Sequence, residues 1–165
     1  MTAAQVLFYL LAAFTVALAL MVVLAQNIVR AAVALIFSFC GLAGLYLLLD
    51  AEFLAAVQVL IYVGGITILL LFAILLTSRI AGKGVRVLNE QKLLSGLVAV
   101  VLVVLLGAAV RRGFPALAAR PPQPENTPAI GELLMTTYAL PFEAVSILLL
   151  VGMVGAIYLA RKEPR

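Results

Sequence analysis

The side chains that could do chemistry in this chain are few, and most of them lie in one apolar run over residues 53–78. The polar side chains near its midpoint are Gln58, Tyr62 and Thr67. They can donate and accept hydrogen bonds, so they could line a hydrated path beside the central Gly64-Gly65 pair. No Asp, Glu, Lys or His occurs within the run. The chain therefore cannot carry a proton relay there by itself.

No apolar run has an acidic residue at its centre. Asp50 and Glu52 precede the run just described, and Glu143 stands near the start of the last apolar run. Because a charge at the centre of a membrane helix is costly, these positions suggest contact with water or headgroups. Glu143 is either a solvated acid near a helix N-terminus or a residue with a pairing or relay role. Glu52 and Glu143 join Gln58 and Thr67 as candidate residues of a hydrated path whose other titrating groups belong to partners.

The run over residues 53–78 is longer than a membrane span requires. Its 26 residues would form a helix of about 39 Å, against roughly 30 Å of hydrocarbon. Such a helix must tilt, bend or rewind locally. The Gly64-Gly65 pair falls at its middle, and kinks cluster at paired glycines and at π-bulges. Two interpretations stay open: the pair allows close helix packing, or it is a mobile hinge.

Composition places these residues in a membrane. Apolar residues make up 66% of the chain and charged residues 11%, against roughly 45–50% and 25% in soluble proteins. The runs are apolar on every face, which favours helices over the alternating strands of a barrel. The sequence predicts an all-α membrane protein with five spans, at about residues 3–25, 30–49, 52–78, 92–110 and 141–160.

Basic residues predict the orientation of these spans. With five spans the two termini lie on opposite faces of the membrane. Eight basic residues share one face: Arg30, Arg79, Lys83, Arg86, Lys92, Arg161, Lys162 and Arg165. Three share the other: Arg111, Arg112 and Arg120. Since cytoplasmic loops carry the excess of Lys and Arg, we expect the N-terminus outside and the C-terminus in the cytoplasm.

The chain is expected to form a single membrane domain over residues 1–165, because its only long polar stretch, residues 111–140, is too short and proline-rich for a catalytic domain. The prolines there, which favour extended backbone, are Pro115, Pro121, Pro122, Pro124 and Pro128. The topology places this stretch outside. Its last part, residues 130–140, mixes apolar and polar residues and could form a short amphipathic helix in the interface.

Several classes of function are excluded by composition. The chain has no histidine, no tryptophan and one cysteine, so an internal disulfide is impossible and zinc and iron–sulfur sites lack ligands. Any redox centre is expected in another polypeptide. The net charge of +4 comes from short connections between spans, which is a topology pattern and not a nucleic-acid surface.

Small and weakly polar residues in the other spans have structural interpretations. The glycine pairs expected to form packing notches are Gly41/Gly44 and Gly152/Gly155. The side chains expected to bond carbonyls of their own helices are Ser38, Cys40 and Ser146.

The segment from Glu52 through Tyr62 to Gly64-Gly65, with the Leu/Ile/Phe-rich run after it, resembles the third helix of a known family. That family is subunit J of bacterial NADH–quinone oxidoreductase, or respiratory complex I, whose mitochondrial counterpart is NADH dehydrogenase subunit 6. Weaker matches occur in the right order over residues 25–32, 44–52, 140–150 and 160–163. Only the fourth span and the proline-rich stretch carry no specific resemblance.

The resemblance implies five helices in the bacterial cytoplasmic membrane, beside subunits A, H and K and next to the antiporter-like subunits. It implies no cofactor in this chain, with FMN, iron–sulfur clusters and the quinone on other subunits. It also implies a π-bulge near the Tyr-x-Gly segment that forms and disappears as the helix rotates, which makes Tyr62, Gly64 and Gly65 the conformational gate. Some relatives have an acid where Gln58 stands, and the neutral amide argues against a proton-accepting role there.

The predicted function is that of a non-catalytic membrane subunit of an H⁺-translocating NADH–quinone oxidoreductase, which couples quinone reduction to proton movement through a mobile third helix. Three alternatives remain open. The chain could belong to a multisubunit cation/proton antiporter, it could be a scaffold that never moves, or its complex could use another electron donor.

Overall fold

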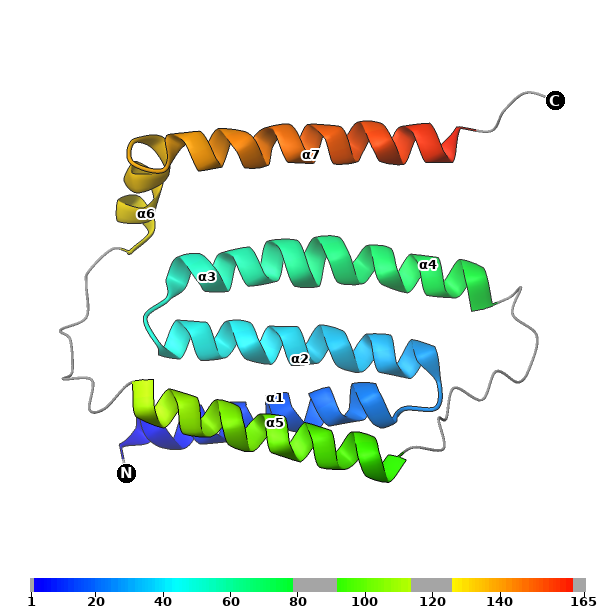
Figure 1. The fold of residues 1–165 in the computed structure, drawn as a ribbon, viewed down its shortest axis with the longest axis vertical. Helices are drawn as coiled ribbons and strands as arrows, with labels where there is room; N and C mark the ends of the chain where they lie inside the picture. Colours follow the sequence, from blue (N-terminus) through cyan, green and yellow to red (C-terminus); the bar gives the residue numbers. More distant parts are fainter. Residues whose placement is uncertain (1, 79–91, 114–125, 162–165) are drawn as a thin grey trace. The chain divides into compact units, whose positions relative to one another are not determined.

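The computed structural model describes residues 2–78, 92–113 and 126–161 of the chain. These residues form helices and turns, with no strand among them. The helices are α1 (Ala3–Leu24), α2 (Ile28–Leu48), α3 (Glu52–Val57), the π-helix η1 (Gln58–Thr67), α4 (Ile68–Ser78), α5 (Lys92–Gly113), α6 (Asn126–Met135) and α7 (Ala139–Ala160) (Figure 1). Because α3, η1 and α4 run on without a break, the described part contains five helices long and apolar enough to cross a membrane. The prediction of an all-helical chain with five such spans is confirmed.

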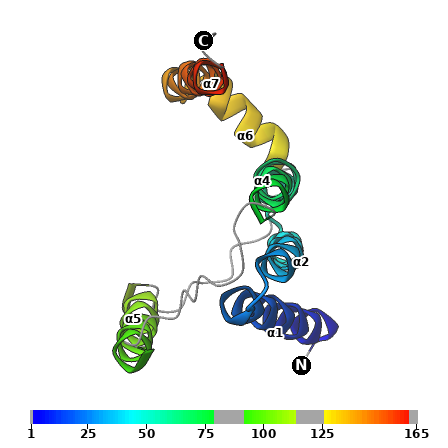
Figure 2. The same cartoon turned by 90° about the vertical axis from the view of Figure 1, so that its right-hand side faces the viewer.

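The chain divides into two compact units, residues 1–74 with 123–165, and residues 75–122. In the first unit α2 lies between α1 on one side and the continuous α3–η1 stretch on the other (Figure 1, Figure 2). The α6 helix packs on α3, and α7 packs on α6. The α2 helix is therefore the centre of the first unit, and it forms the wall against which η1 lies.

The distribution of side chains between surface and interior is the reverse of that in a water-soluble protein. Large apolar side chains point outward, with Val23 81%, Leu140 80% and Leu159 85% exposed. The buried residues are small or polar: Ala32, Ala34, Ser38, Gly41, Ala43, Ala55, Gln58 and Thr67. Close approach through small residues is how helices associate in lipid, so the exposed apolar surface is suited to lipid and partner helices.

Two glycines of α2 let it approach α1 closely. A Cβ added at Gly41 would lie 2.3 Å from Thr15 Oγ1, and one at Gly44 would lie 2.7 Å from Leu11 Cδ2. Both glycines are packing notches, as the sequence predicted. By contrast, apart from the adjoining backbone of α7 itself, no described atom lies within 4 Å of a Cβ built at Gly152 or Gly155.

The hydroxyl of Ser38 also belongs to the contact between α1 and α2. It donates to the Thr15 carbonyl oxygen of α1 at 3.4 Å, so the prediction that it bonds its own helix is wrong. The close approach at Gly41 brings the α1 carbonyl within reach, which a single helix cannot reveal. Ser146 does donate to its own helix, to the Phe142 carbonyl oxygen at 3.1 Å.

The turn between α1 and α2 is held by the Asn27 side chain. Its Oδ1 accepts from the backbone N–H groups of Val29 at 2.9 Å and Arg30 at 3.4 Å. An asparagine at this position satisfies N–H groups that have no partner within the helix. The helix therefore begins at Ile28, two residues before the predicted start at Arg30.

The turn between α2 and α3 places Asp50 in the left-handed region, with φ 55°. Its N–H donates to the Leu47 carbonyl oxygen at 3.2 Å, and the Ala51 N–H donates to the Tyr46 carbonyl oxygen at 2.9 Å. These two bonds form a Schellman cap. Asn126, the first residue of α6, donates from Nδ2 to the Asp50 carbonyl oxygen at 2.6 Å, so this turn connects the start of α6 to the start of α3.

The helices after the proline-rich stretch begin earlier than predicted. The α6 helix covers Asn126–Met135 instead of residues 130–140, and Pro128 falls in its first turn, where a missing N–H costs nothing. The α7 helix starts at Ala139, so Glu143 stands in its second turn, beyond the turn in which the dipole acts strongly. Glu143 is therefore an exposed acid near the start of α7 but outside its first turn.

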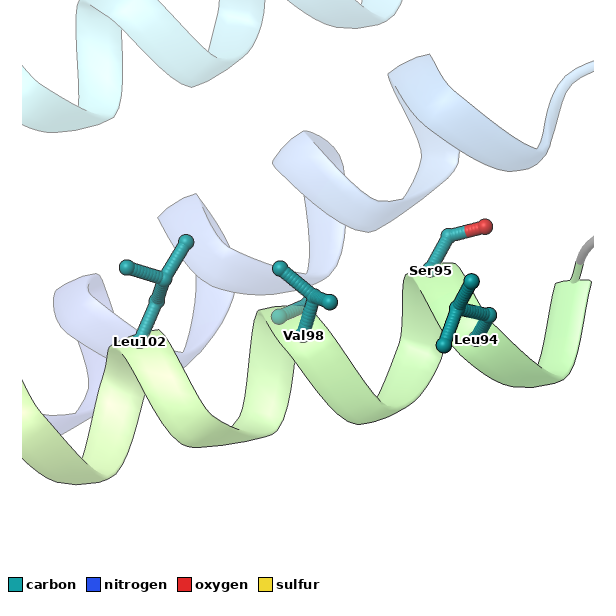
Figure 3. Close-up of a pocket in the computed structure, with 5 residues that line it drawn as sticks. Leu94, Ser95, Val98 and Leu102 are labelled. Atoms are coloured by element: carbon teal, nitrogen blue, oxygen red, sulfur yellow. The ribbon is translucent and has the colours of Figure 1, made fainter.

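In the second unit, the described residues are 75–78, at the end of α4, and the helix α5. The α5 helix ends at Gly113, three residues later than predicted. It carries Arg111 and Arg112 in its last turn, where the negative end of the helix dipole stabilises cations. Leu94, Ser95, Val98, Ala99 and Leu102 line a shallow open hollow along it (Figure 3). All five residues come from one helix, so the hollow has no opposite wall and does not form a ligand pocket.

Candidate functional site

The centre of the third span is a π-helix, η1, ten residues long. It begins at Gln58, ends at Thr67 and contains the Tyr62-x-Gly64 segment at which the family resemblance implied a π-bulge. A π-helix widens the turn so that each N–H reaches the carbonyl five residues earlier. Such segments are rare in proteins, and those that occur are often found at functional sites. The local rewinding that the overlong apolar run required is thus a change of helix type.

The π-helix changes which side chains share a face. Gln58 and Thr67 are nine residues apart, which is about two turns of a π-helix at roughly 4.4 residues per turn. In an α-helix of 3.6 residues per turn the same separation is about two and a half turns, which puts them on opposite faces. Both are buried, with 5% of Gln58 and none of Thr67 exposed. The π register therefore buries two polar side chains that an α-helix would separate.

The hydroxyl of Thr67 is satisfied inside η1, where it donates to the Tyr62 carbonyl oxygen at 2.5 Å. The Tyr62 ring meets the Phe39 ring of α2 edge to face, with centroids 5.6 Å apart and planes at 67°. Aromatic pairs favour this geometry. The Tyr62 side chain is 42% exposed, so it lies at the edge of the contact between η1 and α2.

The two central glycines differ in how much room they have. A Cβ at Gly64 would lie 3.3 Å from the Val59 carbonyl oxygen, whereas one at Gly65 would lie 3.8 Å from the Leu60 carbonyl oxygen. No atom of another described helix lies within 4 Å of either. Among the described helices the pair therefore has no packing partner of the kind seen at Gly41. The closer contact makes Gly64 the position at which a side chain would crowd the π-helix.

The structure brings together only part of the predicted site. The gate residues Tyr62, Gly64 and Gly65 lie in η1 with Gln58 and Thr67. Glu52 is exposed in the first turn of α3, and Glu143 is exposed on α7, which packs on α6 and on no other described element. Neither acid is brought to η1. No group of three His, Cys, Asp or Glu side chains that could hold a metal occurs in the described ranges.

The sequence reasoning missed Phe39. Its ring is the partner of Tyr62, but an apolar residue in the middle of an apolar span carries no pattern that marks it. The sequence offered one signal for the face of α2 that meets the third span, the small residues along α2 such as Ala32 and Ala43, which the structure buries.

Comparison with known proteins identifies the class to which this multi-pass membrane protein belongs. The family described as NADH-ubiquinone/plastoquinone oxidoreductase chain 6 matches residues 18–159. The F(420)H(2) dehydrogenase subunit J of Methanosarcina mazei is 43% identical over 158 residues, covering 94% of this chain and 90% of that protein. The NAD(P)H-quinone oxidoreductase subunit 6 of the Paulinella chromatophora chromatophore is 46% identical over 158 residues, covering 94% and 77%.

A further relative is the NADH-quinone oxidoreductase subunit J of Rickettsia bellii, 33% identical over 165 residues, covering 96% of this chain and 80% of that protein. The chain belongs to the NADH-ubiquinone/plastoquinone oxidoreductase chain 6 family. The resemblance to subunit J seen in the sequence is confirmed.

Proposed function

We propose that this chain is a membrane subunit of a proton-translocating quinone oxidoreductase, and that η1 is the element through which quinone reduction is coupled to proton movement. The observation that carries the proposal is a ten-residue π-helix in the middle of a membrane span of this family. A π-helix can return to an α-helix by shifting its hydrogen bonds by one residue, which rotates everything beyond it. Tyr62, Gly64 and Gly65 are the moving segment.

The chain contributes no redox centre in this proposal. It has no histidine and one cysteine, which leaves too few ligands for a haem or an iron–sulfur cluster. FMN, iron–sulfur clusters and the quinone are assigned to other subunits. Catalysis of electron transfer is therefore assigned to those subunits, and this chain acts on it through its conformation.

NADH is the donor that we propose, on the model of the subunits named after it. The names of these relatives include three different donors, F(420)H(2), NAD(P)H and NADH. All three relatives nevertheless align with nearly the whole of this chain. The chain therefore does not select the donor. All three relatives are subunits of dehydrogenases or quinone oxidoreductases, which favours this assignment over a cation/proton antiporter.

The exposed apolar faces of α5 and α7 are suited to partner helices as well as lipid, because the described helices leave large side chains such as Leu159 mostly exposed. We propose subunits A, H and K and the antiporter-like subunits as the neighbours, in a bacterial cytoplasmic membrane. Glu52 and Glu143 would then meet partner groups, since each is exposed here.

Deletion of the gene tests this function. Membranes of the deletion strain should lose NADH-driven quinone reduction and the proton uptake coupled to it, because the moving segment is absent. Reduction of an artificial acceptor that takes electrons ahead of the quinone should persist, since the flavin belongs to another subunit. Membranes with normal NADH-driven pumping and impaired cation/proton exchange would instead identify an antiporter subunit.

The orientation of the spans is a separate prediction. We expect the C-terminus in the cytoplasm and the turn between α6 and α7 outside, because of the distribution of Lys and Arg. In a chain whose Cys40 is replaced by Ala, Thr137→Cys should react with an impermeant thiol reagent in intact cells. Glu163→Cys should react only after the membrane is opened. The reverse labelling pattern would invert the topology.

A further inference from the structure

Thr67 is the most deeply buried side chain of the described chain, although it carries a hydroxyl in an apolar span. None of its surface is exposed, and its Oγ1 donates to the Tyr62 carbonyl oxygen, five residues earlier. A buried hydroxyl without a partner would be costly. The hydrogen bond to the Tyr62 carbonyl oxygen therefore helps to keep the Thr67 side chain in its buried position.

Three other hydroxyl side chains of the described residues donate to a carbonyl at a different sequence separation. Thr15 donates to the Leu11 carbonyl oxygen at 2.8 Å, Thr136 to that of Glu132 at 2.7 Å, and Ser146 to that of Phe142 at 3.1 Å. Each of these partners lies four residues earlier, which is the spacing that an α-helix offers. The Thr67 bond spans five residues, which is the spacing of a π-helix. The bond is thus specific to the π register.

The position of Thr67 at the last residue of η1 adds a second dependence on register. If η1 became an α-helix, Thr67 would turn by about half a revolution relative to Gln58, because nine residues make about two and a half α-helical turns. One of the two side chains would then no longer lie on the buried face of η1. Both the hydrogen bond and the burial of Thr67 therefore favour the π-helix.

We propose that Thr67 is a positioning residue that holds η1 in the π register through its hydroxyl bond to the Tyr62 carbonyl. The role of the register in turnover rests on the function proposed above, whereas the effect of Thr67 on the register does not. In an α-helix the hydroxyl would exchange this buried bond for one to the carbonyl four residues earlier, as Thr15 does, so removing it shifts the ratio of the two helix types by the difference between the two bonds. A difference of about one buried hydrogen bond corresponds to a shift of roughly two- to tenfold.

The test uses the whole purified complex with Thr67→Val, which keeps the side-chain shape and removes the hydroxyl, and Thr67→Ser, which keeps the hydroxyl. Cryo-EM classification measures the fraction of particles with π-helical density over residues 58–67. We expect Thr67→Val to lower the ratio of π to α particles roughly two- to tenfold, and Thr67→Ser to restore it. Thr15→Val, the same change at a hydroxyl bonded four residues back, should leave the ratio unchanged.

An unchanged ratio in Thr67→Val would overturn the proposal, and so would an equal shift in Thr15→Val. Thr67→Ala gives the same comparison if the valine variant does not assemble. Quinone-dependent turnover of the same preparations separates the two proposals. A shifted ratio with normal turnover keeps the role of Thr67 and removes η1 as the coupling element, whereas an unchanged ratio removes the role of Thr67 alone.

Discussion

Gly64→Val is expected to slow quinone-dependent turnover by roughly 5- to 150-fold while the complex stays assembled. A Cβ at Gly64 would lie 3.3 Å from the Val59 carbonyl oxygen, closer than most Cβ atoms come to a neighbour. A β-branched side chain adds further restriction. A strained backbone state costs about 1–3 kcal/mol, and this cost would fall on the π-helix, which shifts the equilibrium by the stated factor. Native gels measure assembly, and quinone reduction measures turnover.

The matched control for this variant is the neighbouring glycine. Gly65→Ala places its Cβ 3.8 Å from the Leu60 carbonyl oxygen, an ordinary contact, and should change turnover less than Gly64→Ala. Electron transfer to an acceptor ahead of the quinone should be normal in all three variants. Equal rates for the two alanine variants, or wild-type pumping by assembled Gly64→Val, would contradict the assignment of Gly64 to a moving segment.

Gly41→Val is expected to prevent accumulation of the assembled complex. The added Cβ would lie 2.3 Å from Thr15 Oγ1, so α1 and α2 could no longer approach as they do. Overpacking of this kind costs about 1–3 kcal/mol and occasionally more, and a β-branched residue cannot turn its methyl groups away from the contact. The yield of complex on native gels and its half-life at elevated temperature check the prediction.

A second-site change provides the control for Gly41. Thr15→Ala removes the oxygen and leaves the Thr15 Cβ, which lies 3.4 Å from the added Cβ. The pair Gly41→Ala with Thr15→Ala should therefore assemble better than Gly41→Ala alone. The Ser38 bond to the Thr15 backbone carbonyl survives in the pair. Failure of Thr15→Ala to improve assembly would show that the contact with Thr15 does not limit the packing.

The two predictions concern glycines whose different structural roles could not be distinguished from the sequence. Gly41 and Gly64 are each followed by a second glycine within an apolar span, yet a neighbouring helix crowds Gly41 while only its own backbone crowds Gly64. The difference depends on which face of each helix meets a partner. The hydrophobic pattern of a membrane span does not mark that face, since lipid-facing and helix-facing residues are both apolar.

Helix ends were predicted to within a few residues for a related reason. Hydropathy indicates where a span must be, but the first residue of a helix depends on a cap, as at Asn27, where the side-chain oxygen accepts from Val29 and Arg30. The α6 helix begins four residues before its predicted start, because the prolines predict extended backbone up to that point. In the first turn of a helix Pro128 is well tolerated.

The sequence alone determined that five helices of this chain are long and apolar enough to cross a membrane, and it located the point in the third span where regular helix could not continue unchanged. Those properties follow from the transfer free energies of individual residues and from the length of an apolar run, which add along the chain. Tertiary structure decided the helix type of that segment, the face of α2 that receives it, and the burial of Thr67. Those properties depend on which carbonyl each N–H and hydroxyl reaches and on the helix packed alongside, and neither is a sum over residues.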